Sequence, residues 1–153
     1  MWNVIGQNLA LNYLKKSFAS NRLSHAYLFV GPAQIGKMTL ALNLAQAVNC
    51  TSENQKKPCD SCSQCNRTLA GKHTDVDIIK AYEPSRNGTT RHRIGIDQIR
   101  ELQHKLNLKP FEGAFRVTIF DDAERMTEEA SNALLKTLEE PPSQSLLILL
   151  SSQ

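Results

Sequence analysis

The chain has 153 residues, of which 41% are hydrophobic and 22% charged, with a formal net charge of +3. This length can bury the core of one domain, and the composition excludes a disordered or fibrous chain. The longest apolar run, residues 146–150, is far shorter than the roughly 20 residues of a membrane helix, and the N-terminus lacks the pattern of a secretory signal. We therefore expect a cytoplasmic protein with no membrane partner.

The first third of the chain predicts a helix, a strand and a second helix. Apolar residues at helical spacing mark residues 8–19, and a short apolar run at residues 26–30 stops at a Gly-Pro pair, as a buried strand does. Helical periodicity returns over residues 40–50. The glycine-rich segment between the strand and the second helix is therefore in the context that a phosphate-binding loop requires.

The rest of the chain continues the alternation. We expect strands at residues 76–80, 116–120 and 146–150, and helices at residues 96–106 and from Thr127, a good N-cap, to Pro141. A polar loop covers residues 84–93. Strands alternating with helices predict an α/β fold with a parallel sheet and helices on both faces. Because the chain stops directly after an apolar strand, we expect it to be a fragment.

Residues 31–38 almost complete the phosphate-binding pattern G-x-x-x-x-G-K-[ST]. Gly31, Gly36 and Lys37 are in place, but Met38 stands where a hydroxyl should ligate Mg²⁺. A thioether cannot replace a hard oxygen ligand. Thr39 could substitute, although one residue further along a helix points about 100° away. The pattern therefore predicts a phosphate cradle with impaired Mg²⁺ binding.

Asp121 and Asp122 follow the strand at residues 116–120 and are candidates for the acidic pair of such a site, the alternative being a helix-capping pair. Asp121 would hold Mg²⁺ through water. Asp122 would orient the attacking water, a task usually given to the longer glutamate, and catalysis depends on such placement. Met38 and Asp122 together indicate a site that keeps phosphate binding and loses turnover, so ATP and Mg²⁺ are doubtful cofactors.

All four cysteines lie in one window with the spacing C-x8-C-x2-C-x2-C: Cys50, Cys59, Cys62 and Cys65. We expect a tetrahedral zinc site, structural because four thiolates leave no open position, with His73 outside the ligand set. A thiol switch through C-x-x-C is the alternative. Four thiolates and Zn²⁺ would lower the net charge to about +1, so the basicity does not argue for nucleic-acid binding.

Three segments together resemble the bacterial DNA polymerase III clamp loader: residues 6–37, the cysteine window, and SNALLKTLEEPP at residues 131–142. The resemblance implies a three-layer AAA+ P-loop NTPase domain over residues 1–153, with a zinc module inserted at residues 50–65 and with the lid and C-terminal domains missing. Met38 and Asp122 favour a delta-prime-like stator over a gamma/tau-like ATPase motor, which is the alternative. The family's Ser-Arg-Cys motif would lie beyond Gln153.

The same resemblance implies a role in loading the sliding clamp onto primed DNA, as a component of the DNA-directed DNA polymerase III holoenzyme with gamma/tau and delta subunits as partners. Arg91, Arg93 and Lys136 match positions that touch DNA phosphates in the family, although each alone is equally well explained as a solvated side chain. A zinc module that itself binds nucleic acid is an alternative of another class, and we rank it low.

Overall fold

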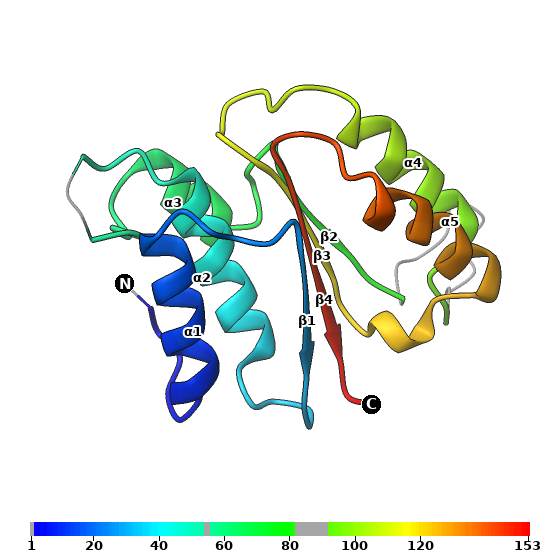
Figure 1. Cartoon of the computed structure of the whole chain (residues 1–153), viewed down its shortest axis with the longest axis horizontal. Helices are drawn as coiled ribbons and strands as arrows, with labels where there is room; N and C mark the ends of the chain where they lie inside the picture. Colours follow the sequence, from blue (N-terminus) through cyan, green and yellow to red (C-terminus); the bar gives the residue numbers. More distant parts are fainter. Residues whose placement is uncertain (1, 54–55, 82–91) are drawn as a thin grey trace.

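The computed structural model describes residues 2–53, 56–81 and 92–153 (Figure 1). Its centre is a parallel sheet of four strands in the order β1-β4-β3-β2. The strands are β1 (Ala26–Val30), β2 (Val76–Ile79), β3 (Arg116–Phe120) and β4 (Ser145–Ser151). Since all four run in one direction, their carboxyl ends meet at one edge of the sheet. The expected strands are confirmed, with β2 one residue shorter and β4 slightly longer than the patterns predict.

Helices cover both faces of the sheet, as the alternation predicts (Figure 1). On one face lie α1 (Asn8–Ala19), α2 (Lys37–Asn49) and the short α3 (Ser63–Leu69). On the other lie α4 (Ile96–Leu106) and α5 (Glu128–Glu139), with the 3-10 turn η1 (Ala123–Arg125) between β3 and α5. No helix among the described residues is long and apolar enough to cross a membrane.

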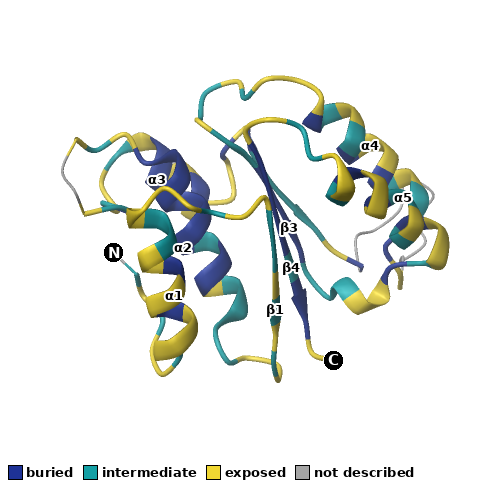
Figure 2. Cartoon of the chain, in the orientation of Figure 1, coloured by how far each residue is buried: buried dark blue, intermediate teal, exposed yellow. Residues whose placement is uncertain are grey.

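The sheet separates two hydrophobic cores, and β4 contributes to both by alternation. Leu146 and Ile148 pack with α1 and α2, whereas Leu147 packs with α4 and α5. This period of two follows from the pleat of a strand that is buried on both faces. Burial is concentrated in β3, β4 and the inner sides of the helices (Figure 2). The expectation that the strand at residues 26–30 is buried is wrong, because β1 is an edge strand and its Leu28 and Val30 remain 62% and 55% exposed.

Local signals explain where the helices begin. The hydroxyl of Thr127 accepts a hydrogen bond from the backbone N–H of Ala130 at 3.1 Å, which confirms the expected N-cap of α5. Helix α3 was not expected from the sequence. It begins after Cys62, whose sulfur accepts the backbone N–H of Cys65 at 3.4 Å in place of the usual oxygen. A cysteine therefore caps this helix.

Candidate functional site

The phosphate-type loop lies at the carboxyl edge of the sheet, between β1 and α2. Gly36 is the N-cap of α2 and has φ +98°, a left-handed conformation that glycine adopts without steric cost. The first turn of α2 therefore opens directly from the loop. A helix N-terminus with free backbone N–H groups is a favourable place for a phosphate.

The ammonium group of Lys37 is held by backbone carbonyls at this edge. Its Nζ donates to the carbonyl oxygens of Gly31, of Pro32 at 3.2 Å and of Ser151 at 3.1 Å. These bonds tie the loop to the end of β4. A phosphate oxygen would compete with these carbonyls, because an ammonium has three donors in all.

A cavity of about 490 Å³ lies in front of Lys37, and it gathers residues from the loop before α2, from the first turn of α2, from the segment directly after β3 and from the end of β4. Met38 and Thr39 both line it, although Met38 is half-buried against the core while Thr39 is exposed. The cavity wall comprises Ala33, Gln34, Gly36, Lys37, Met38, Thr39, Asp121, Asp122, Leu150 and Ser152. The cavity wall thus contains every sequence-predicted residue of the nucleotide site except Gly31. The carbonyl of Gly31 accepts a hydrogen bond from Lys37, which does line the cavity.

The two aspartates stand at the end of β3 in different backbone settings. The N–H of Asp121 donates to the carbonyl of Ile79 at 2.9 Å, which continues the pairing with β2. Asp122 has φ 56° and ψ 56°, a left-handed conformation that aspartate tolerates better than most residues. Its carbonyl accepts the N–H of Arg125 at 2.9 Å. The chain therefore turns sharply at Asp122, and both side chains stay at the cavity.

Sequence reasoning missed a third acid, Glu124, near this cavity. The carboxylate of Glu124 accepts the hydroxyl of Ser152 at 2.8 Å and its N–H at 3.5 Å. Partial burial would raise the pKa of Glu124, but hydrogen bonds from its own N–H and from Ser152 lower it below the usual range. Glu124 therefore holds the residue after β4 beside the cavity. No pattern in the sequence signals this contact across 28 residues.

The four cysteine sulfurs lie within 4.8 Å of one another, on the side of α2 and α3. Sulfurs bound 2.3 Å from one zinc ion would stand about 3.8 Å apart, so a small contraction completes a tetrahedron. Two backbone N–H groups already point at sulfur: Cys62 N–H to Cys59 Sγ at 3.3 Å and Cys65 N–H to Cys62 Sγ at 3.4 Å. Such donors stabilise thiolates. The cluster therefore fits a structural zinc ion held by Cys50, Cys59, Cys62 and Cys65.

The four thiols differ in their surroundings. Cys50 and Cys65 are buried, whereas Cys59 and Cys62 are partly exposed. Hydrogen bonds from the Ser61 hydroxyl, the Ser61 N–H and the Cys62 N–H lower the pKa of Cys59 to about 6. Burial raises the pKa of Cys65. The Cys59 thiol is thus easier to deprotonate than the Cys65 thiol, and a metal ion would have to displace the proton from Cys65.

A buried polar network fixes α3 to the rest of the domain. Gln46 of α2 donates through Nε2 to the carbonyl of Cys65 at 3.1 Å. His73 lies outside the sulfur cluster, as expected, and bonds to Gln64 through Nε2, while its Nδ1 accepts the N–H of Asp75 at 3.0 Å. Burial lowers the pKa of His73, so the ring is neutral with its proton on Nε2.

The comparisons with known proteins agree with this architecture. A family model described as "DNA polymerase III, delta subunit" matches residues 6–153. The chain belongs to this family of DNA polymerase III subunits. DNA polymerase III subunit tau of Bacillus subtilis (strain 168) is 36% identical over 151 residues, which is 99% of this chain and 25% of that protein. Subunit delta' of the same organism is 35% identical over 147 residues, which is 96% of this chain and 42% of that protein.

A solved structure supports the fold of this chain. The gamma subunit-related protein of Thermotoga maritima matches with a TM-score of 0.58 and 26% identity, over 91% of this chain and 39% of that chain. The present chain therefore spans a quarter to two fifths of the relatives' lengths. Relatives named tau and delta' match almost equally well, so overall identity does not separate the two kinds of subunit.

Of the predicted DNA-contact residues, the structure describes Arg93 and Lys136. Arg91 lies outside the described residues. Arg93 is exposed, and its guanidinium donates to the carbonyl of Met126 at 3.4 Å, beside the N-termini of α4 and α5. Lys136 is exposed on α5, nine residues after the N-cap Thr127 and therefore roughly 13 Å further along the axis.

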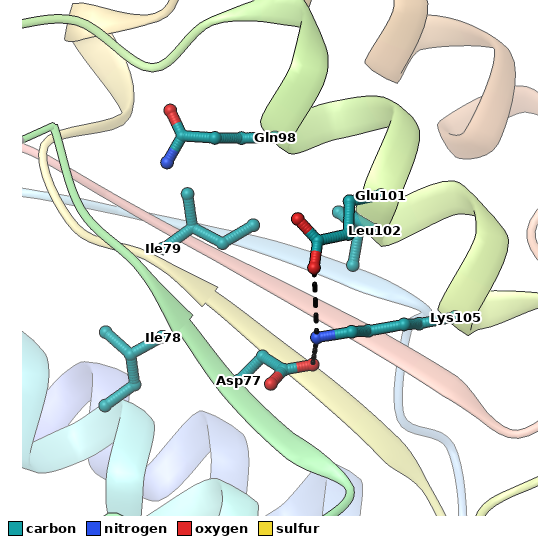
Figure 3. A pocket seen from close by; sticks show the side chains of 7 residues that line it. All are labelled: Asp77, Ile78, Ile79, Gln98, Glu101, Leu102 and Lys105. Atoms are coloured by element: carbon teal, nitrogen blue, oxygen red, sulfur yellow. Dashed lines mark ion pairs between the residues drawn. The ribbon is translucent and has the colours of Figure 1, made fainter. Parts of the chain in front are cut away.

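Another cavity, between β2 and α4, contains neither Arg93 nor Lys136 (Figure 3). Lys105 of α4 pairs there with Asp77 of β2 at 3.7 Å and with Glu101 at 3.9 Å. Gln98 and Ile79 close its upper part in the view of Figure 3. Exposed ion pairs of this kind contribute little stability. We assign this cavity a structural role in docking α4 onto the edge strand.

Proposed function

We propose that this chain is the nucleotide-binding-fold domain of a delta-prime-like clamp-loader subunit, whose own ATP turnover is weak or absent. The observation that carries the proposal is Met38, half-buried on the first turn of α2 and at the wall of the phosphate cavity. A Mg²⁺ ion bridging the phosphates needs an oxygen ligand at this position. The thioether supplies none and makes that wall of the cavity apolar.

The remaining parts of the site support phosphate binding without turnover. Gly36 and the α2 N-terminus offer backbone donors, and Lys37 stands at the loop with its charge. Asp121 would hold a metal ion through water. Asp122 is shorter than glutamate and sits on a left-handed turn, so its carboxylate would be poorly placed to orient an attacking water.

A domain of this kind would act through its contacts with other subunits rather than by hydrolysing ATP. In this proposal, residues 1–153 form the AAA+ domain and residues 50–65 its zinc module. The domain assembles with gamma/tau and delta subunits and helps place the sliding clamp on primed DNA. Family membership, relatives named tau and delta', and the preserved fold around a depleted site support this assignment.

A gamma/tau-like motor is the second candidate, and one observation favours it. Thr39 lines the same cavity as Asp121 and Asp122, so a hydroxyl is present one residue beyond the usual position. The first turn of α2 would have to rotate by about 100° to place that hydroxyl where Met38 stands. Because Met38 packs against the core, such a rotation would uncover apolar surface.

We propose that Arg93, which precedes α4, and Lys136, which lies on α5, contact DNA. The cavity between the N-termini of α4 and α5 is lined by Arg93 and by backbone near Gly95 and Thr127, where N–H groups favour a phosphate. Asp97, Glu128 and Glu129 line it as well and weaken its attraction for anions. A phosphate contact here would position the duplex without reading sequence.

Nucleotide binding by the full-length protein tests the proposed site. We expect a fluorescent ATP analogue to bind with nearly the same affinity with and without Mg²⁺, because the phosphate cradle lacks the metal ligand. Lys37→Met should abolish this binding, whereas Lys72→Met, an exposed lysine beyond α3, should leave it unchanged. An affinity that rises tenfold or more with Mg²⁺ would contradict the proposed loss of metal binding and favour the motor.

A further inference from the structure

The zinc module has an inner and an outer half that are held in different ways. The inner half, Gln64, Cys65 and Thr68 of α3, is buried and bonded to α2 and His73. The outer half, residues 56–62, is partly exposed. It is tied inward by Lys57, which donates to the carbonyl of Cys50 at 3.1 Å, and by the sulfur contacts. The sulfur cluster is therefore a main attachment of the outer half.

A groove gives solutes access to one sulfur of the cluster. This cavity of about 930 Å³ lies between α1 and the outer half of the module. Cys59 is the one cysteine that lines it, among Trp2, Lys15, Phe18, Ala19, Ser52, Lys56, Lys57, Pro58, Asp60 and Ser61. Cys50 and Cys65 are 6% and 0% exposed, so small reagents do not reach their sulfurs in the same way.

Cys62 is placed to react with Cys59. It lies three residues further on, its N–H donates to Cys59 Sγ at 3.3 Å, and the two sulfurs are within 4.8 Å of each other. Cys62 Sγ is also 4.0 Å from Cys50 Sγ, so a competing pair exists. Burial of Cys50 disfavours that pair as the first to oxidise, since an oxidant must reach one of the two sulfurs.

We propose that Cys59 is the reactive ligand of the zinc module, and that a peroxide entering through the groove joins it to Cys62 and releases the metal. The Cys59 thiolate attacks one oxygen of hydrogen peroxide, giving a sulfenic acid and hydroxide. The Cys62 thiolate then attacks the Cys59 sulfur, forming the disulfide and releasing a second hydroxide. Two thiolates have lost two electrons, and the peroxide has gained them. Cys50 and Cys65 alone cannot retain zinc as four ligands do.

Loss of the metal in this way would alter the groove and leave the domain folded. The inner half keeps its bonds to Gln46 and His73, which do not involve sulfur side chains. The outer half loses the attachment that the sulfur cluster provides, keeps the hydrogen bond of Lys57 to the Cys50 carbonyl, and shifts against α1. Trp2 lines the groove and is the only tryptophan in the sequence, so its fluorescence reports this movement directly.

The first experiment uses the zinc-loaded full-length protein and N-ethylmaleimide, with labelled positions mapped by mass spectrometry. We expect Cys59 to react at least about tenfold faster than Cys50 and Cys65, because access controls thiolate reactivity. Peroxide should then yield the Cys59–Cys62 disulfide, one zinc ion per chain in a metal-indicator assay, a change in Trp2 fluorescence and an unchanged far-ultraviolet circular dichroism spectrum. Equal labelling of Cys50 or Cys65, or a first disulfide without Cys59, would overturn the proposal.

A second experiment separates reactivity from ligation. Cys59→His keeps a nitrogen ligand for zinc and removes the thiol. We expect this variant to bind one zinc ion and to release it at least about tenfold more slowly than the unmodified protein at the same peroxide concentration. Release at the unmodified rate would assign the reactive position to another cysteine. If the variant binds no zinc, the labelling order in the unmodified protein decides.

Discussion

Asp75 holds the turn before β3 through one buried carboxylate, and replacing it by asparagine gives a quantitative test of the fold. Its oxygens accept three backbone N–H groups, from Phe111 at 2.7 Å, Glu112 at 2.8 Å and Gly113 at 2.7 Å. Burial alone would raise the pKa of Asp75, but these three bonds lower it below the usual range. The Asp75 carboxylate therefore stays charged although it is buried, because three backbone N–H groups donate to it.

Asparagine keeps the shape and offers one acceptor oxygen instead of two. At least one N–H is left facing an amide NH₂, which costs about 1–3 kcal/mol, and the retained bonds fall from charged to neutral strength. We expect Asp75→Asn to lower the free energy of unfolding by about 2–4 kcal/mol in urea titrations, and the melting temperature by roughly 5–15 °C.

The matched control for this prediction is Asp77→Asn, two residues further on, in β2. Asp77 forms an exposed pair with Lys105 (Figure 3), and its loss should cost less than about 0.5 kcal/mol. If Asp75→Asn is no more destabilising than Asp77→Asn, the three hydrogen bonds do not hold the turn and the reasoning is wrong.

Three further predictions follow from charges and the metal site. The pKa of Asp75 is lower in the folded than in the unfolded protein, so the stabilisation by its carboxylate is complete above about pH 4 and disappears as pH falls through the folded pKa. Between about pH 5 and 2.5 the free energy of unfolding should therefore fall less steeply in Asp75→Asn than in the unmodified protein. A strong chelator under reducing conditions should remove one zinc ion per chain and lower the melting temperature, and a metal-free purified protein with the same melting temperature would refute the zinc assignment. Arg93→Gln should weaken DNA binding by the assembled complex and reduce the salt slope by about one, with Lys72→Gln as the unaffected control.

Local patterns predict most elements of this fold. The strand at residues 116–120 is predictable because β3 lies inside the parallel sheet and is buried on both faces, and Thr127 marks the start of α5. The strand at residues 26–30 lies at the edge of the sheet, and its short apolar run ended by Gly-Pro predicts it. Helix α3 escapes prediction because its buried side consists of Gln64, Cys65 and Thr68 rather than a stripe of large apolar residues, and because its cap is a cysteine. The strand order also escapes, since periodicity carries no information about which strands are neighbours.

Contacts between distant polar residues could not be predicted at all. Asp75 meets its three donors 36 to 38 residues away, and Glu124 meets Ser152 after 28 residues. Each partner is an ordinary polar residue when the sequence is read alone. The glycines, Lys37 and the cysteines were predictable because their chemistry requires fixed spacing along the chain. Burial of Met38 depends on tertiary packing and needed the structure.

ATP turnover by the unmodified full-length protein, with and without Mg²⁺, is the most direct test of the stator assignment. We expect a rate of ATP hydrolysis indistinguishable from background with and without Mg²⁺, because Met38 offers no metal ligand and Asp122 is poorly placed for water activation. Met38→Thr should increase Mg²⁺ binding with nucleotide more than it increases turnover, since Asp122 is unchanged. Mg²⁺-dependent turnover in the unmodified protein, abolished by Lys37→Met, would contradict the account and assign this chain to the motor subunits.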